Sequence, residues 1–100
     1  MASNFKKSVY SAVKKIPRGK VATYKQIAIA IKKPKACRAV ASALAVNKNL
    51  IIIPCHRVIK SSLEIGGYRL GQCVKEKYLS QEGIMIKKGK LKDINQLYNF

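Results

Sequence analysis

The sequence predicts a mostly α-helical domain with a small β element, in which two short helices form a winged-helix-like helix-turn-helix. Apolar residues recur at helical spacing in two stretches, 5–16 and 36–44, and prolines at 17 and 34 separate the predicted helices by tight turns. A short run of isoleucines, 51–53, supplies the β element. With 100 residues, 48% of them hydrophobic, the chain is expected to form a single domain with one modest core.

The first helix is predicted from Phe5 to Ile16. Its apolar residues lie close to helical spacing and give it one buried face: Phe5, Val9, Tyr10, Val13 and Ile16. Pro17 ends this helix, and residues 17–20 form a turn.

The helix-turn-helix is predicted from the next two segments. Thr23 and Gln26 have the spacing of a capping box and begin a second helix that continues through Ile27 and Ile31. Pro34 follows two lysines, ends that helix and suits the first position of a third one over about residues 35–46. In this third helix three apolar residues share one face: Ala36, Val40 and Leu44.

The surface of the third helix is unusual because every residue between Ala36 and Val46 is apolar or small except Arg38, its one long cationic side chain. Two readings fit this pattern. The helix could be a buried, alanine-rich element with an outward arginine, or it could lie close to a DNA backbone with Arg38 entering a groove or replacing a base in the stack. The basic charge of the whole chain favours the second reading.

A cysteine, a histidine and an arginine follow the isoleucine run directly, at Cys55, His56 and Arg57. Residues 51–53 suit a strand covered on both faces, whereas Pro54 cannot continue a sheet ladder and forces a turn. A thiol with a pKa of about 8.5 is only slightly ionised at neutral pH, so a nucleophilic cysteine needs a neighbouring base or cation. This arrangement predicts a reactive cysteine held on a rigid turn.

The remaining elements are predicted from turn residues and spacing. Residues 58–68 indicate a hairpin or loop that turns at Ser61-Ser62 and again at Gly66-Gly67. A last helix is expected over about residues 70–82, with Gly83 as its C-terminal cap and three side chains inward: Val74, Tyr78 and Leu79. Residues 84–100 alternate lysines with apolar residues and predict no definite element.

The net charge of +17, from 21 basic and 4 acidic residues, indicates a nucleic-acid partner. A biased genome composition is the alternative explanation. No segment is long and apolar enough for a membrane span or a secretory signal, so an intracellular protein is expected. The three cysteines, Cys37, Cys55 and Cys73, lack the spacing of a disulfide framework or a zinc site, and we expect reduced thiols and no metal.

A histidine that needs a carboxylate to fix its tautomer must find it among four acids: Glu64, Glu76, Glu82 and Asp93. Glu82 lies in the last predicted helical turn, where the helix dipole disfavours a negative charge by roughly 0.3–1 kcal/mol. A cationic partner is therefore expected for it. Nearby lysines could serve, and so could His56, which would complete a Cys–His–Glu relay.

These residues resemble a known family, the O6-alkylguanine-DNA alkyltransferases, or methylated-DNA–protein-cysteine methyltransferases, in their C-terminal DNA-binding and active-site domain. Residues 54–58 are similar to the active-site motif of that family. The resemblance covers about residues 4–83 and leaves 84–100 as a tail of the same single domain. Five further blocks support it in the same order: 19–24, 34–40, Asn47, Gly67-Tyr68, and Lys75-Glu76 followed by Glu82-Gly83.

The resemblance implies irreversible transfer of the O6-alkyl group of a flipped guanine to Cys55, once per molecule and without a cofactor. It implies that a monomer binds double-stranded DNA through the minor groove, with Arg38 in place of the flipped nucleotide; Lys35, Ala36 and Ala41 are the other DNA-binding residues. By the same resemblance, Tyr24 donates a proton to the departing guanine, Asn47 holds the turn that carries the cysteine, and Tyr68 lines the alkyl pocket. Glu82 orients His56, which acts as the base, and Lys75 supports the same network.

Two departures from the family accompany the resemblance. Ala41 stands where the family commonly has glycine, so its methyl group could shift the approach to the backbone. Full-length members usually have an additional N-terminal domain, so a short form, a fragment or a separate partner protein is expected.

Two alternatives stay open: a lesion-binding protein of the alkyltransferase-like kind, which lacks the reactive cysteine, and a helix-turn-helix regulator with a structural cysteine. Repair would take place in the cytoplasm and nucleoid of a prokaryote, or otherwise in the nucleus.

Overall fold

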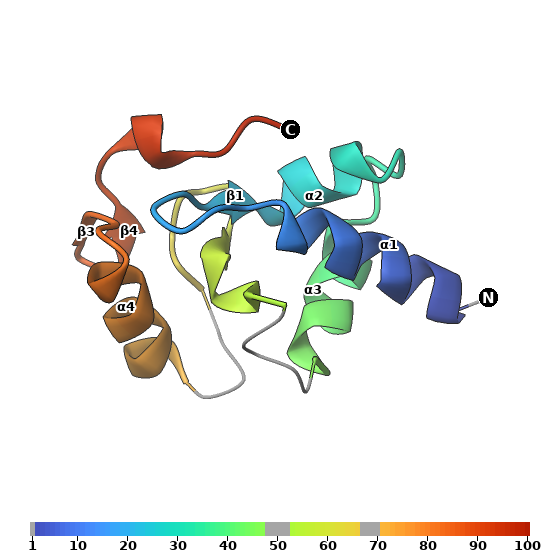
Figure 1. The fold of residues 1–100 in the computed structure, drawn as a ribbon, viewed down its shortest axis with the longest axis horizontal. Helices are drawn as coiled ribbons and strands as arrows, with labels where there is room; N and C mark the ends of the chain where they lie inside the picture. The colour runs from blue at the N-terminus through green and yellow to red at the C-terminus, as the bar shows by residue number, and fades with distance from the viewer. Residues whose placement is uncertain (1, 48–52, 67–70) are drawn as a thin grey trace.

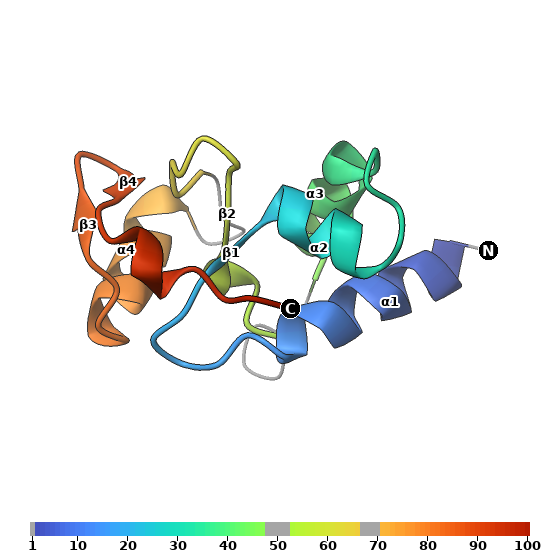
Figure 2. The same cartoon turned by 90° about the horizontal axis from the view of Figure 1, so that it is seen from above.

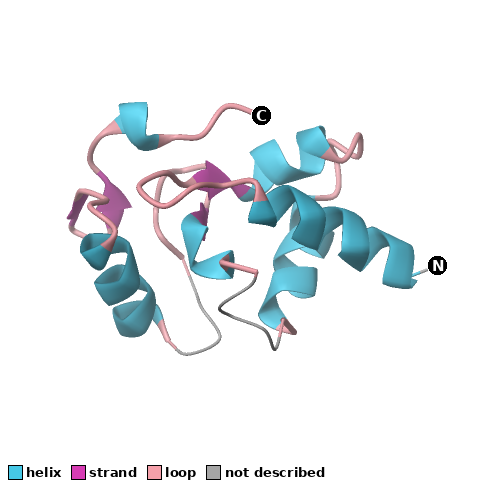
Figure 3. Ribbon diagram, in the orientation of Figure 1, coloured by secondary structure: helices cyan, strands magenta, loops and turns pink. Residues whose placement is uncertain are grey.

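The computed structural model describes residues 2–47, 53–66 and 71–100, with the backbone alone for 2–4 (Figure 1). Helices make up about half of this part of the chain, and strands are confined to two-residue segments (Figure 3). The predicted fold class, mostly α with a small β element, is confirmed. The helices are α1 (Ala2–Lys14), α2 (Tyr24–Ala30), α3 (Cys37–Ala45) and α4 (Gln72–Gln81); the strands are β1 (Ala22–Thr23), β2 (Val58–Ile59), β3 (Ile86–Lys87) and β4 (Lys90–Leu91); the 3-10 helices are η1 (Cys55–Arg57) and η2 (Ile94–Gln96).

The helix α1 packs its apolar stripe against α2 and α3, at the end of the molecule away from β3 and β4 (Figures 1 and 2). Val9 and Val13 are fully buried, as predicted. The helix begins and ends earlier than predicted, so Ile16 lies in the following turn. Its side chain is nevertheless buried in the first core, because the chain turns back over the end of the helix.

Both ends of α2 are fixed by local hydrogen bonds. Gln26 N donates to Thr23 Oγ1 at 3.0 Å and Thr23 N donates to Gln26 Oε1 at 2.8 Å, which confirms the predicted capping box. At the other end Lys32 N donates to Ile29 O and Lys33 N donates to Ala28 O, in the pattern of a Schellman motif. Lys32 occupies the left-handed position of this motif with φ 64°. The turn between the two helices is thus built by the backbone.

The helix α3 begins at Cys37, so the prediction that Pro34 occupies its first position is wrong. Pro34 and Lys35 complete the turn that the Schellman motif starts, and Ala36 N donates to Lys33 O at 2.9 Å. Ala36 is the N-cap residue and makes no side-chain capping bond. Val40 and Leu44 are buried as predicted. Ala36, the third residue of the predicted buried face, is only partly buried because it precedes the helix.

A short strand, β2, directly follows the cysteine motif. Residues 51 and 52 of the predicted strand lie outside the described residues, and Ile53 is in a bend. The carbonyl of Ile53 accepts a hydrogen bond from Cys55 N at 2.8 Å. This bond closes a tight turn, so the carbonyl of Ile53 is bonded within the turn and not to a neighbouring strand. The strand β2 follows and pairs in parallel with β1, with Ala22 opposite Val58.

This small parallel sheet separates two cores. Side chains of successive strand residues point to opposite faces. Accordingly, Ala22 and Val58 belong to the first core, formed with α1, α2 and α3, whereas Val21 and Ile59 belong to a second core. The second core contains side chains from the loop after β2, from α4 and from the C-terminal segment: Ile65, Leu79, Ile84 and Leu91.

The predicted turn at Ser61-Ser62 is confirmed, because Leu63 N donates to Lys60 O at 2.8 Å and Lys60 N donates to Glu64 O at 2.9 Å. Gly67, half of the second predicted turn, lies outside the described residues.

Gly71 is the N-cap residue of α4, so the helix begins two residues later than predicted. Its predicted C-terminal cap is confirmed: Gly83 has φ 84° and Ile84 N donates to Leu79 O at 3.0 Å. Of the predicted inward residues, Leu79 is buried, while Val74 and Tyr78 are partly buried.

Residues 84–100, for which no element was predicted, fold onto the second core. The strands β3 and β4 form an antiparallel hairpin whose turn residues, Lys88 and Gly89, both have positive φ, as in a type I′ turn. The chain then returns toward α2, as Figure 1 shows, and runs beside β1. Val21 N donates to Gln96 O at 2.9 Å and Tyr98 N donates to Val21 O at 2.7 Å.

In the described part of the chain, no helix has the length and apolar character needed to cross a bilayer.

The C-terminal segment should contribute directly to stability. Leu91 is 6% exposed in the second core, and Leu91→Ala is expected to lower the free energy of unfolding by about 2–4 kcal/mol. Ile94→Ala is the control, because Ile94 is 63% exposed and its truncation should change stability by less than about 0.5 kcal/mol. Urea unfolding followed by circular dichroism measures both. Equal stability of the two variants would mean that residues 84–100 do not complete the core.

Candidate active site

The thiol of Cys55 is held by a compact backbone turn at the start of η1. Pro54 has φ −78° and ψ 67°, the geometry of an inverse γ-turn, and Cys55 N donates to Ile53 O across it. Arg57 N then donates to Pro54 O at 2.9 Å. Cys55 is 5% exposed and packs with the first core. These backbone hydrogen bonds therefore hold the residue that bears the sulfur atom in a defined conformation.

Asn47 connects this turn to the end of α3. Its Nδ2 donates to Ile53 O at 3.1 Å, so the carbonyl oxygen of Ile53 accepts two hydrogen bonds. The Asn47 backbone N donates to Leu44 O at 3.1 Å, just beyond the last residue of α3. The side chain is buried. The Asn47 side chain thus links the end of α3 to the cysteine turn.

The carboxylate of Glu82 contacts two other polar side chains, those of His56 and Arg57. His56 Nε2 lies 3.1 Å from Glu82 Oε2. Arg57 forms a bidentate pair with the same carboxylate, with Nε 2.8 Å from Oε1 and NH2 2.7 Å from Oε2. Arg57 NH1 also donates to Ile16 O at 3.0 Å. The predicted contact between Glu82 and His56 is present in the structure, and the cation that pairs with Glu82 is Arg57, which was not predicted.

The charges of this cluster follow from burial and pairing. Burial alone would raise the pKa of Glu82, but hydrogen bonds from Arg57 and His56 hold it below its usual value. Burial lowers the pKa of His56 despite the hydrogen bond to Glu82. At neutral pH we therefore expect an ionised Glu82 beside a neutral His56. Because a carboxylate only accepts hydrogen bonds, the proton of the neutral ring sits on Nε2, and Nδ1 has the character of a base.

Lys75 and Tyr24 lie close to each other, and Lys75 is bonded to β2. Lys75 is fully buried, its Nζ donates to Val58 O at 2.7 Å, and the same atom lies 5.9 Å from the centre of the Tyr24 ring. Burial lowers the pKa of Lys75 to about 8, against the opposing effect of the Cys55 charge. Burial, and secondarily the charge of Cys55, raises the pKa of Tyr24. Lys75 and Tyr24 are therefore both within electrostatic range of the thiol.

The helix α3 presents a mostly small-residue surface to solvent, with Arg38 exposed on it. Lys35 is exposed in the preceding turn, and Ala36 and Ala41 are partly exposed. The structure thus places the four predicted DNA-binding residues on one segment of the helix-turn-helix, outside the cluster around Glu82. Tyr68, the predicted wall of an alkyl pocket, lies outside the described residues.

Two members of the cluster were not predicted as site residues. Arg57 was noted only as a neighbour of the cysteine, yet it makes the two shorter contacts to Glu82. Tyr78 contacts the His56 ring edge to face, with ring centres 5.6 Å apart at 73°. A signal for Tyr78 was available, because it lies four residues before Glu82 on α4 and so shares a face with it.

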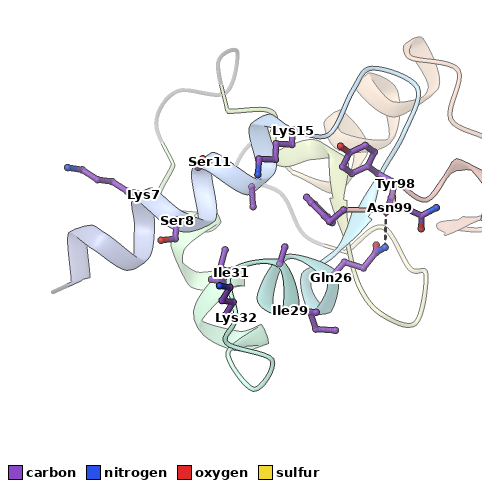
Figure 4. Close-up of a pocket in the computed structure, with 13 residues that line it drawn as sticks. Lys7, Ser8, Ser11, Lys15, Gln26, Ile29, Ile31, Lys32, Tyr98 and Asn99 are labelled. Atoms are coloured by element: carbon purple, nitrogen blue, oxygen red, sulfur yellow. Dashed lines mark hydrogen bonds between the residues drawn. The ribbon is translucent and has the colours of Figure 1, made fainter.

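A groove of about 1040 Å³ lies between α1, α2 and the C-terminal residues (Figure 4). Gln26 closes one side, where its Nε2 donates to Tyr98 O at 2.9 Å. The groove contains no residue of the cluster around Cys55 and Glu82. Among the described residues, no three His, Cys, Asp or Glu side chains gather closely enough to hold a metal ion.

Comparisons with known proteins agree with the fold and with the sequence motif. Residues 4–84 match the family model described as 6-O-methylguanine DNA methyltransferase, DNA binding domain. The chain is 50% identical over 78 residues to the bifunctional transcriptional activator/DNA repair enzyme Ada of Escherichia coli, covering 78% of this chain and 22% of that protein. It is 49% identical over 80 residues to a methylated-DNA–protein-cysteine methyltransferase of Methanosarcina barkeri, covering 80% and 51%.

A solved structure extends the likeness to nearly the whole chain. The crystal structure of S. pombe Atl1 in complex with damaged DNA containing O6-carboxymethylguanine has a TM-score of 0.88 and 31% sequence identity, covering 97% of this chain and 96% of that one. The curated relatives are longer: this chain spans about half or less of the length of those from M. barkeri and E. coli.

The pair between Glu82 and Arg57 should be visible in the pH dependence of stability. Near pH 7, Glu82→Gln is expected to lower the free energy of unfolding by about 2–3 kcal/mol, because Arg57 loses its buried anionic partner. The pKa of Glu82 is lowered on folding, so its contribution is present above the unfolded value of 4.5 and is lost as the pH falls through the lower folded value. The difference between parent and variant should therefore shrink below about pH 4.5.

The control for this prediction is Glu76→Gln, which removes a partly buried acid from the same helix that has no ion pair among the described residues. It should change stability by less than about 0.5 kcal/mol at any pH. Denaturant unfolding at several pH values measures both variants. A Glu82→Gln curve that runs parallel to the parent down to acid pH would contradict the assigned charge state.

Proposed function

Because the chain belongs to the 6-O-methylguanine DNA methyltransferase family, in its DNA-binding domain, we propose that it repairs alkylated DNA by transferring the O6-alkyl group of a flipped guanine to Cys55. The observation that carries the proposal is the bond between His56 and Glu82 at the turn that bears the cysteine. It supplies a base with a defined tautomer one residue from the nucleophile. The names of two relatives, the DNA repair enzyme Ada and the methylated-DNA–protein-cysteine methyltransferase of M. barkeri, support transfer of an alkyl group from DNA to a cysteine.

The reaction begins with removal of the thiol proton. Glu82 keeps a proton on Nε2 of His56, so Nδ1 takes the proton of Cys55, directly or through a water molecule. The ammonium group of Lys75 favours the resulting thiolate, since the two charges interact. Asn47 holds the turn through Ile53 O, so that the sulfur keeps its direction during attack. Arg57 keeps the carboxylate of Glu82 in place.

The thiolate then attacks the alkyl carbon in line, a carbon–sulfur bond forms and the bond from that carbon to guanine O6 breaks. The departing guanine takes a proton from Tyr24, whose raised pKa keeps it protonated at neutral pH. The proton held by His56 can then return to the tyrosinate. A thioether offers no easy leaving route to water, so each molecule acts once and needs no cofactor. Tyr68 would line the pocket for the alkyl group.

The helix-turn-helix would present the base. Extrusion of a nucleotide costs a few kcal/mol, which phosphate contacts and the side chain that replaces the base must offset. We assign this replacement to Arg38, exposed on a surface of small residues, with Lys35, Ala36 and Ala41 against the DNA backbone. Ala41 brings a methyl group to a position that is commonly glycine in the family. The partner is double-stranded DNA with O6-alkylguanine, bound by a monomer inside the cell.

A second candidate function is lesion binding without transfer. It is favoured by the match to Atl1, because that structure holds damaged DNA and the similarity spans nearly the whole of both chains. The presence of Cys55 distinguishes the two proposals, since lesion binding requires no nucleophile. Both share the helix-turn-helix and the flipped base.

Transfer can be detected directly by weighing the intact protein after reaction with a duplex that contains O6-methylguanine. We expect one added methyl group, on Cys55, and none with Cys55→Ala. The matched controls are Cys37→Ala and Cys73→Ala, which remove thiols outside the site and should gain the methyl group as the parent does. Binding of the damaged duplex without any gain in mass would favour the lesion-binding function.

The role of Arg38 can be tested by comparing duplex and single-stranded substrates. Arg38→Ala should transfer methyl from the duplex at least about tenfold more slowly, because about 1.4 kcal/mol of extrusion energy corresponds to a factor of ten. Transfer from a single-stranded oligonucleotide, in which no base must be extruded, should change little. Single-turnover rates at saturating protein measure both. A loss of equal size on the two substrates would contradict the flipping role.

A further inference from the structure

The hairpin of β3 and β4 carries four lysines within six residues: Lys87, Lys88, Lys90 and Lys92. All four are exposed. The hairpin lies just beyond the family match, which ends at residue 84, and none of its residues takes part in the cluster around Glu82. In Figures 1 and 2 it occupies the end of the molecule opposite α1.

The arrangement of these charges does not stabilise the hairpin. Lys87 and Lys90 are directly opposite each other in the register, and like charges in that relation are destabilising. Lys88 adopts φ 52°, a left-handed conformation that glycine or asparagine reaches at lower cost. Both features therefore weaken an isolated hairpin.

The nearby acids do not neutralise the hairpin. Glu64 pairs with Lys90 through a backbone bridge, but its carboxylate accepts a hydrogen bond from Ser62 Oγ. Asp93 caps η2 by accepting from Asn95 N. Within the described ranges both ion pairs are made by Glu82, and neither includes a hairpin lysine. The four charges are therefore available to a ligand.

The hairpin is nevertheless held rigidly. Leu91 is buried in the second core, and its N donates to Leu63 O at 2.8 Å. Ile65 N donates to Gly89 O at 2.9 Å, at the tip of the turn. The lysines are thus displayed by a fixed scaffold, which reduces the ordering cost of binding.

We propose that this hairpin is a second phosphate-binding element, which contacts the backbone of DNA beside the segment bound by the helix-turn-helix. Lysine ammonium groups bind phosphates as point charges and read no sequence, so the contact would raise affinity for damaged and undamaged duplex alike. The proposal rests on the proposed function only in that the partner is duplex DNA. It requires no transfer chemistry.

The test compares the parent with the variant Lys87→Gln, Lys88→Gln, Lys90→Gln and Lys92→Gln. The probe is an undamaged duplex of roughly 20 base pairs, about 68 Å at 3.4 Å per pair and so longer than the 38 Å long axis of the protein. Binding is measured by fluorescence anisotropy over a range of salt concentrations. Each phosphate contact contributes about 0.9 to the slope of log K against log salt, so the slope should fall in magnitude by roughly 2–4.

The matched control replaces four exposed lysines on α1 and at the first residue after it by glutamine: Lys6, Lys7, Lys14 and Lys15. It changes the net charge equally at the other end of the molecule. The proposal is wrong if the slope lost by the hairpin variant is no larger than that lost by the control. Thermal unfolding without DNA must show the hairpin variant folded, with a melting temperature no lower than that of the parent, since repulsion between Lys87 and Lys90 is relieved.

Methyl transfer separates this proposal from the proposed function. At saturating protein the hairpin variant should transfer methyl to Cys55 at the rate of the parent, because the change affects binding and not the chemical step. If the parent transfers no methyl, the proposed function fails, while the salt dependence on undamaged duplex still decides the role of the hairpin.

Discussion

The carboxylate of Glu82 places a negative charge where three segments of the chain meet. It accepts hydrogen bonds from Arg57 and His56 on η1, and Arg57 continues to the carbonyl of Ile16 after α1. A half-buried charge at a helix C-terminus is unfavourable by itself, because burial and the helix dipole both oppose it. The bidentate guanidinium of Arg57 offsets this cost and keeps Glu82 ionised. Gly83, in a left-handed conformation, ends α4 directly after the acid. The tautomer of His56 depends on this carboxylate.

The small parallel sheet explains how a short chain combines this cluster with a DNA-binding surface. One face of β1 and β2 closes the core under the helix-turn-helix, and the other face closes the core under α4 and residues 84–100. Asn47 and Cys55 lie on the side of the first core, whereas Glu82 follows α4, which packs on the second. The site therefore lies at the junction of the two cores. Burial of Lys75 beneath β2 places a cation at the same junction.

Local patterns in the sequence were sufficient to predict most of the helices and the contact between His56 and Glu82. The Thr23–Gln26 capping box and Gly83 cap were predicted correctly because the bonds that define them lie within a few residues. The start of α3 was not, because the Schellman motif at Lys32 needs a left-handed lysine that composition does not indicate. Likewise, β2 and residues 84–100 are ordered by partners far along the chain: Ala22 opposite Val58, and Val21 bonded to Gln96 and Tyr98. Arg57 was missed as the main partner of Glu82 for the same reason.

The exposed turn at Ser61-Ser62 divides the chain between its two functional halves. The cysteine, the histidine and Arg38 precede this turn, whereas Glu82, Lys75 and the lysine hairpin follow it. A chain cut there would divide the second core, which draws Val21 and Ile59 from one fragment and Leu79 and Leu91 from the other. Neither fragment alone would hold both His56 and the carboxylate of Glu82 that it contacts.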